Sequence, residues 1–169
     1  MIFKTNIKLE LDRLLNDLSQ VVSVFNSMNQ LAIVYDPKKV IDGHEPHFSA
    51  IGKSPIDIDE WNLTEVCPIF KNTYLEEVID IIPYQKQRIR LMRMLPKTTY
   101  SMHVDTYKRL HWALITDPSC HLTFQSNAKF FGWHIPADGF GYLADTTKMH
   151  SAVNPWDQIR YHLVIDIKE

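Results

Sequence analysis

From residue 84 onward the chain consists of short segments in which apolar and polar residues alternate, and this pattern constrains the fold most strongly. Alternation with a period of two is typical of β-strands that bury one face. Turn signals separate the segments at Pro96, Asp117-Pro118, Asp138-Gly139 and Asn154-Pro155. About seven or eight short strands in about eighty residues predict a β-sandwich or a jelly roll. The predicted strands are QRIRLMRML, YSMHVD, LHWALIT, CHLTFQ, FFGWHIP, GFGYLAD, KMHSAV and IRYHLVIDI.

The N-terminal half of the chain carries helical patterns as well. Leucines and valines recur at helical spacing over residues 11–25, which predicts an amphipathic helix. Residues 64–82 show a second pattern of this kind, which Pro83 ends. We expect strands at IFKTNIKLE and LAIVYDP, a long surface excursion over residues 38–62, and two helices that cover one outer face of the sheet.

These patterns together predict a mainly β protein with N-terminal helices, folded as a double-stranded β-helix, the jelly roll of cupin-like proteins. A chain of 169 residues is long enough to bury a core, so we expect a single domain over residues 1–169. Within it, residues 1–83 would form a helical and loop part that packs on the sheet, and residues 84–169 would form the jelly-roll core.

The composition makes nucleic acid an unfavoured partner, although the basic run at Arg88–Arg93 does not allow it to be excluded. The net charge of −2 provides no global basic field that would recruit nucleic acid or anionic lipid. The N-terminus lacks an apolar signal core and no apolar run is long enough to cross a bilayer, so we expect a cytoplasmic protein without a membrane partner. Cys67 and Cys120 have no metal-ligand spacing around them and are expected to be buried, reduced thiols.

His103, Asp105 and His150 are the candidate metal ligands. In an extended chain His103 and Asp105 point to the same side, so both can bind one ion, and His150 on a later strand can supply a third ligand. Two histidines and one carboxylate on one side of an octahedron are typical of non-haem Fe(II) oxygenases. The HxD motif alone is weak, and a core histidine beside a turn aspartate is the alternative interpretation.

Arg160 is the expected companion of this metal site. A hairpin centred on Pro155 would place His150 and Arg160 opposite each other, with the guanidinium beside the metal. A buried guanidinium needs an anionic partner, and its planar fork suits a carboxylate. A dicarboxylate cosubstrate that chelates the metal and contacts Arg160 would explain both features. The alternative is an outward-facing arginine on a solvated strand.

Further residues are candidates for lining the same cavity. Arg109 and His111 share one face of their predicted strand, where they could contact a carboxylate or a substrate. Trp112 and Trp133 could border a substrate pocket, although core or rim packing is the simpler interpretation. Arg93 is the third substrate-pocket candidate.

Arg93 belongs to a local basic run with Arg88 and Arg90. A solvated sheet face is the favoured explanation of this run, and binding of an acidic substrate is the lesser one.

The order of these motifs resembles the aspartyl/asparaginyl β-hydroxylase family of Fe(II)/2-oxoglutarate-dependent dioxygenases. The resemblance covers roughly residues 87 to 167: an apolar strand ending at Pro96-Lys97, the HxD pair, Arg109-Leu110-His111, the segment from Gly139 to His150, and RYHLVID beginning at Arg160. It departs from the family at Pro96-Lys97, where members have proline and glycine, and at Asp105, because some members lack the carboxylate ligand. The first eighty or so residues match no motif of the family.

The resemblance implies a jelly roll that uses Fe(II), 2-oxoglutarate and O2 and releases succinate and CO2. It implies that Arg160 binds the distal carboxylate of 2-oxoglutarate, and that Arg109 and His111 position the cosubstrate or the substrate. No catalytic residue beyond the metal ligands is implied. The substrate would be an amino acid, either as a small molecule or within a peptide or protein, hydroxylated by default at its β-carbon. The oligomeric state stays open.

Two alternatives remain at this point. One is a cupin-like metalloprotein with other chemistry, which would share the histidines without needing Arg160. The other is a non-catalytic jelly roll that binds a metal.

Overall fold

The computed structural model describes residues 1–25, 29–40, 45–48 and 63–168, and its largest element is a six-stranded antiparallel sheet. In order across the sheet, the strands are β1 (Ile2–Lys8), β10 (Phe140–Ala144), β7 (Lys108–Ile115), β12 (Arg160–Ile167), β5 (Lys86–Met94) and β2 (Gln30–Ala32).

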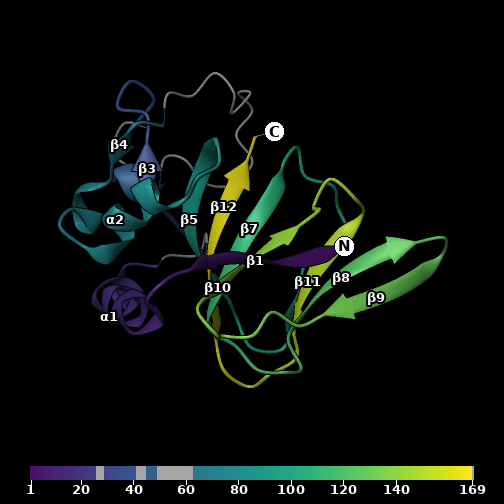
Figure 1. Ribbon diagram of the computed structural model, residues 1–169. Helices are drawn as coiled ribbons and strands as arrows, with labels where there is room; N and C mark the ends of the chain where they lie inside the picture. The colour runs from purple at the N-terminus through teal and green to yellow at the C-terminus, as the bar shows by residue number, and fades with distance from the viewer. Residues whose placement is uncertain (26–28, 41–44, 49–62, 169) are drawn as a thin grey trace.

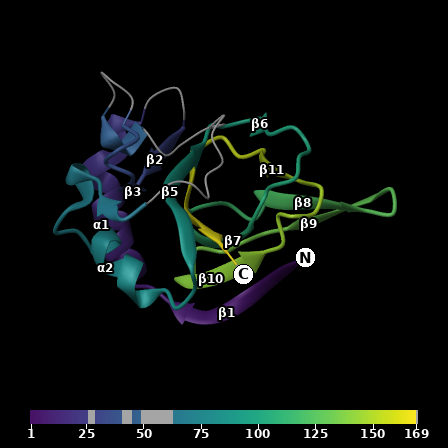
Figure 2. The same cartoon turned by 90° about the horizontal axis from the view of Figure 1, so that it is seen from above.

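A four-stranded antiparallel sheet lies opposite the large sheet (Figures 1 and 2). Its strands, in order, are β6 (Thr98–Thr99), β11 (His150–Asn154), β8 (His121–Ser126) and β9 (Lys129–Trp133). A small ladder joins β3 (Val34–Tyr35) to β4 (Glu65–Val66). Two facing antiparallel sheets with few helices confirm the predicted fold class, a mainly β jelly roll.

Two helices, α1 (Leu11–Val21) and α2 (Tyr74–Ile81), cover the outer face of the large sheet (Figure 2). The helix predicted over residues 11–25 gives way to a 3₁₀ turn at Val22–Val24. The helix predicted within residues 64–82 begins only at Tyr74, because β4 and a 3₁₀ turn at Pro68–Phe70 occupy the earlier part. Proline lacks the N–H that an uninterrupted α-helix needs in its interior, so Pro68 falls at the start of the short turn instead.

The central strands have two different faces. On β12, Tyr161, Leu163, Ile165 and Ile167 belong to the core shared with the helices, whereas the even-numbered residues from Arg160 to Asp166 lie on the inner face toward the second sheet. The two sets alternate because successive side chains of a pleated strand point to opposite faces of the sheet. The apolar cluster between the two sheets is small, and its buried members are Ala113, Leu122, Phe124, Ile135 and Ala144.

The N-terminal part contributes strands to the large sheet as well as helices. β1 pairs with β10, and β2 pairs with β5, so the sheet draws on residues on both sides of the expected boundary at residue 83. The excursion expected over residues 38–62 lies largely outside the described residues, of which it includes only 38–40 and 45–48.

The strand predicted at YSMHVD is wrong. β6 covers only Thr98–Thr99, and beyond it His103 makes a single bridge to His150. Within the described residues, no helix combines the length and apolar character needed to span a membrane.

Asp17 ties the two helices together. It is buried on α1, and its carboxylate accepts a hydrogen bond from the backbone N–H of Leu75, 2.8 Å away in the first turn of α2. First-turn N–H groups have no partner inside their own helix, so Asp17 acts as a cap supplied by a neighbouring helix.

We expect Asp17→Ala to lower the free energy of unfolding by about 1–3 kcal/mol, because a buried N–H loses its acceptor. Asp17→Asn keeps an oxygen acceptor and should lose less. Urea denaturation followed by circular dichroism measures both variants. Equal stability of the wild-type protein and Asp17→Ala would contradict this role.

Candidate metal centre and anion site

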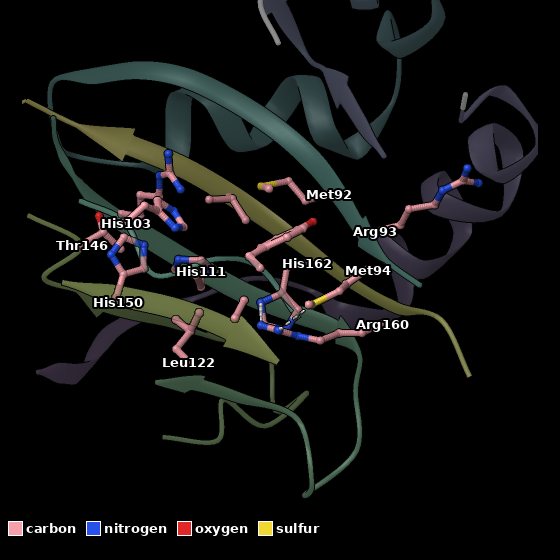
Figure 3. A pocket seen from close by; sticks show the side chains of 14 residues that line it. Met92, Arg93, Met94, His103, His111, Leu122, Thr146, His150, Arg160 and His162 are labelled. Atoms are coloured by element: carbon pink, nitrogen blue, oxygen red, sulfur yellow. Dashed lines mark hydrogen bonds between the residues drawn. The ribbon is translucent and has the colours of Figure 1, made fainter. Parts of the chain in front are cut away.

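A pocket lies between the two sheets and contains most of the polar groups of the inner faces (Figure 3). His103 and His150 lie at one end of it, Arg160 at the other, and His111 between them. The lining residues are Met92, Arg93, Met94, Tyr100, His103, Arg109, His111, Leu122, Thr146, His150, Ala152, Arg160, His162 and Val164.

The backbone holds the two candidate histidine ligands side by side. His103 and His150 exchange two backbone hydrogen bonds of 2.9 Å, and their ring centroids lie 4.4 Å apart. The Nδ1 atom of His103 is 2.7 Å from the carbonyl oxygen of Ser101, and that of His150 is 2.9 Å from that of Lys148. A carbonyl oxygen only accepts, so both Nδ1 atoms carry the proton and both Nε2 lone pairs are available to an ion.

Asp105 faces both imidazoles. One carboxylate oxygen, Oδ2, lies 3.2 Å from Nε2 of His150, and the other, Oδ1, lies 3.9 Å from Nε2 of His103. Burial alone would raise the pKa of Asp105, but the contact with His150 and the charge of Arg109 outweigh it and hold the pKa below its usual value. The carboxylate is therefore ionised, as a metal ligand must be.

The three residues fit a divalent metal ion. One ligand atom from each of His103, Asp105 and His150 lies within 4.8 Å of the other two. Oδ2 of Asp105 is buried and accepts no hydrogen bond of good geometry, although it lies 2.7 Å from Nη1 of Arg109. A buried carboxylate oxygen with an unused lone pair, facing two imidazole lone pairs, is a donor set suited to a divalent metal ion.

His150 and Arg160 reach this pocket from opposite sheets, so the predicted hairpin between them is wrong. β11 pairs with β6 and β8, whereas β12 pairs with β5 and β7. The chain crosses between the sheets after Asn154, whose Nδ2 lies within 3.0 Å of the carbonyl oxygens of Met94, Leu95 and Gln158. The two side chains consequently face each other across the cavity instead of sitting on neighbouring strands.

Arg160 is a buried cation without a carboxylate partner among the described residues. Its Nε donates to Nε2 of His162 at 2.8 Å, and its Nη1 lies 3.9 Å from Sδ of Met94. Burial lowers the pKa of Arg160 to about 10, which leaves the guanidinium charged at neutral pH. Burial and the charge of Arg160 lower the pKa of His162 well below its usual value, so His162 is a neutral acceptor. A buried guanidinium that no carboxylate of the described residues contacts is a candidate anion-binding group.

His111 lies between the two ends of the pocket (Figure 3). Its side chain is buried and neither ring nitrogen has a hydrogen-bond partner. Burial, followed by the charge of Arg160, lowers the pKa of His111 well below its usual value, so the ring is neutral and offers one donor and one acceptor. Unsatisfied groups of this kind in a pocket are candidate ligand contacts.

Arg109 is engaged by two carboxylates of the protein. Its Nη2 donates to Oδ1 of Asp105 at 2.8 Å, and its Nε donates to Oδ1 of Asp166 at 3.0 Å. Arg109 also lines the pocket, and its expected role in positioning the cosubstrate or the substrate stays a prediction.

The basic run at Arg88 and Arg90 does not form a solvated sheet face, and that expectation is wrong. Arg88 and Arg90 point inward and contact Asp166 at 2.8 and 2.7 Å. Burial would raise the pKa of Asp166, but the three arginines outweigh it and lower the pKa to about 2. The pattern within β5 alone does not reveal the buried countercharge, because Asp166 lies on the neighbouring strand β12.

Of the three substrate-pocket candidates, Arg93 is among the lining residues and the two tryptophans are not. Trp112 is buried in the core under the helices, where Gly141 leaves room for its ring: a Cβ there would lie 2.5 Å from Cζ2 of Trp112. The side chain of Arg93 points away from the pocket, with Nε donating to Oδ1 of Asn29 at 2.8 Å (Figure 3). Trp133 is exposed on β9 at the edge of the small sheet and is absent from the lining.

The sequence interpretation missed Asp166 and assigned no role to His162. One signal was available: Arg160, His162, Val164 and Asp166 occupy alternate positions of a single predicted strand, so a strand that points Arg160 inward also points the others inward.

Comparison with solved structures shows the same fold in proteins of low sequence identity. AviO1 from Streptomyces viridochromogenes aligns with a TM-score of 0.55 and 11% identity over 99% of this chain and 89% of its own. A Pseudomonas putida prolyl-4-hydroxylase aligns with a TM-score of 0.54 and 9% identity over 99% and 92%. EvdMO1 aligns with a TM-score of 0.55 and 15% identity over 99% of this chain, which spans about half of EvdMO1 (47%).

Comparison with curated proteins gave no match. A family model described as aspartyl/asparaginyl beta-hydroxylase matches residues 59–169, which is more than half of the chain and includes the three candidate metal ligands and Arg160. This chain therefore belongs to the aspartyl/asparaginyl β-hydroxylase family.

Proposed function

We propose that this protein is an Fe(II)- and 2-oxoglutarate-dependent dioxygenase that hydroxylates a C–H bond of an amino acid, free or within a peptide or protein. One observation carries the proposal: Arg160, a buried arginine that no carboxylate of the described residues contacts, and a His–Asp–His cluster lie at opposite ends of one pocket. A dicarboxylate that binds the metal with one carboxylate can pair its other carboxylate with Arg160.

His103, Asp105 and His150 would hold the iron. When bound, Fe(II) supplies the oxygen chemistry, in which O2 and 2-oxoglutarate oxidise the substrate C–H to C–OH and yield succinate and CO2. The protein contributes geometry: the Nδ1 contacts of both histidines fix the ring orientations, and the Arg109 fork fixes the carboxylate.

Arg160 would bind the distal carboxylate of 2-oxoglutarate. His162 accepts the Nε hydrogen of Arg160 at 2.8 Å and also lies 3.3 Å from Nη2, which orients the guanidinium, while Nη1 has only a weak contact of 3.9 Å with Sδ of Met94 and would bind the ligand. His111 can donate to or accept from the cosubstrate or substrate, because both ring nitrogens are unpartnered. Arg109 would orient the carboxylate of Asp105, to which its Nη2 donates, and from its place in the pocket lining it would also help to position the cosubstrate or the substrate.

The substrate class follows from the family, whose name refers to hydroxylation at the β-carbon of aspartyl and asparaginyl residues. We further expect a cytoplasmic protein. Both Cys67 and Cys120 are free and buried, which fits a reducing compartment.

Anaerobic addition of Fe(II) and 2-oxoglutarate to the apoprotein should produce a visible charge-transfer band, because the cosubstrate binds directly to the metal. Arg160→Met should weaken 2-oxoglutarate binding on the order of 100-fold, since a buried charge pair is lost. Titration of the band with 2-oxoglutarate measures the affinity. Arg160 does not contact the metal ligands, so the affinity of Arg160→Met for the metal alone is the internal control and should be unchanged.

Two outcomes of this titration favour the alternatives. An Arg160→Met protein that keeps full 2-oxoglutarate affinity points to a cupin-like metalloprotein with other chemistry. A wild-type protein that binds metal but forms no band with 2-oxoglutarate points to a non-catalytic jelly roll.

Incubation with Fe(II), 2-oxoglutarate, ascorbate and a set of amino acids and peptides should convert one class of them to a product heavier by one oxygen atom. Mass spectrometry detects this product and stoichiometric succinate. His150→Ala should abolish both signals because the metal loses a ligand, and Ile81→Ala, an exposed position of α2 outside the pocket lining, is the control. Absence of oxygen insertion and of succinate across the set would contradict the proposal.

A further inference from the structure

An ionic chain links the metal-binding cluster to the interior of the large sheet. Asp166 lies on the inner face of β12, directly opposite Arg109 on β7. Its side chain is 1% exposed, against 12% for Arg109 and 15% for Asp105. The chain therefore runs from a fully buried carboxylate, through an arginine, to a candidate metal ligand at the pocket.

Each link of this chain is a short contact. Oδ1 of Asp166 accepts from Nε of Arg109 at 3.0 Å, and the two Nη atoms of Arg109 lie 2.8 and 2.7 Å from the two oxygens of Asp105. One planar guanidinium thus contacts two carboxylates with its three nitrogens. A lysine has a single nitrogen and cannot contact both carboxylates in this way.

The carboxylate of Asp105 depends on this arginine. Asp105 lies outside the named strands, and its backbone is held by a hydrogen bond from its N–H to the carbonyl oxygen of Thr146. Among the described residues, the carboxylate itself contacts only the two candidate histidine ligands and Arg109. When imidazole lone pairs face an ion they do not donate to the carboxylate, which leaves Arg109 to fix its plane.

Asp166 is itself held firmly. Oδ2 accepts from Nε of Arg88 at 2.8 Å, and Oδ1 also accepts from Nη2 of Arg90 at 2.7 Å. These two arginines come from β5 and Arg109 comes from β7, so Asp166 joins three adjacent strands of the large sheet. Its position is set by the most regular part of the fold.

We propose that Asp166 and Arg109 are positioning residues of the metal site: Asp166 holds Arg109, and Arg109 orients Asp105 toward the ion. This inference rests on the metal site of the proposed function and not on its cosubstrate or substrate. Two residues of β12 would then act on the site: Arg160 contacts the anion, and Asp166 affects how tightly the metal is held.

The test measures Ni(II) affinity by isothermal titration calorimetry, without cosubstrate or substrate. Nickel is not oxidised in air and binds imidazole strongly, so the titration also works with weakened sites. Asp166→Asn should lower Ni(II) affinity on the order of 10- to 100-fold, as is usual when an outer partner of a metal ligand is removed.

The same substitution in an Asp105→Ala background separates positioning from a general effect on the fold. That background keeps both imidazoles but removes the carboxylate through which Asp166 acts. Asp166→Asn should then change Ni(II) affinity less than about threefold, because the two sites are coupled only through Asp105. An equal loss in both backgrounds overturns the proposal, as does an unchanged affinity of the single variant.

Two further variants show whether a lower affinity comes from loss of folding, and circular dichroism monitors the fold of each variant. Asp17→Ala also removes a buried aspartate but lies on α1, in the helical layer, and its Ni(II) affinity should match that of the wild type. Arg109→Lys keeps the charge, and it should show the same loss as Asp166→Asn and the same insensitivity in the Asp105→Ala background. If Asp166→Asn does not fold, Arg109→Lys alone decides, and an affinity equal to that of the wild type overturns the proposal.

Failure of the proposed function gives a different pattern. A wild-type protein that does not bind Ni(II) at all contradicts both the metal site and this inference. A wild-type protein that binds Ni(II) together with an unaffected Asp166→Asn protein contradicts the inference alone.

Discussion

The three central strands of the large sheet, β5, β12 and β7, bury both of their faces, and the two faces have opposite chemistry. The outer face carries aliphatic and aromatic residues that pack under the two helices. The inner face carries arginines, histidines and Asp166 and points toward the second sheet. Charges that are removed from water must be paired or must bind something, so the inner face constrains the rest of the site.

Among the described residues, the charged side chains of the inner face are almost all paired with an opposite charge. Arg88 and Arg90 contact Asp166, and Arg109 divides its donors between Asp166 and Asp105. Arg160 differs, because among the described residues its strongest partner is the neutral His162. The pocket therefore combines one end that suits a divalent cation with another end that suits an anion, and this polarity is the physical basis of the proposed cosubstrate binding.

Much of this site follows from local sequence patterns. Alternation placed Arg109 and His111 on the face opposite Leu110 and Trp112, and the structure has them so. The turn at Lys97 also has a local explanation: its φ of +54° is in the left-handed region that favours glycine, which is the residue that the family resemblance has there. The positions of His103, Asp105 and Arg160 relative to one another do not follow from local patterns, because His103 and Asp105 come from an irregular segment and Arg160 from a strand of the large sheet.

The sequence by itself determined the mainly β fold, the two helices, which residues of a strand share a face, and the residue types suited to a metal and an anion. These are properties of short stretches, set by backbone geometry and by the period of the apolar residues. Only the tertiary structure decided that β11 and β12 belong to opposite sheets, that Arg88 and Arg90 are buried around Asp166, and that Trp112 packs against Gly141. These features depend on how distant segments pair as strands. That pairing in turn depends on whether the buried charges and side-chain volumes of several strands are compatible with one another.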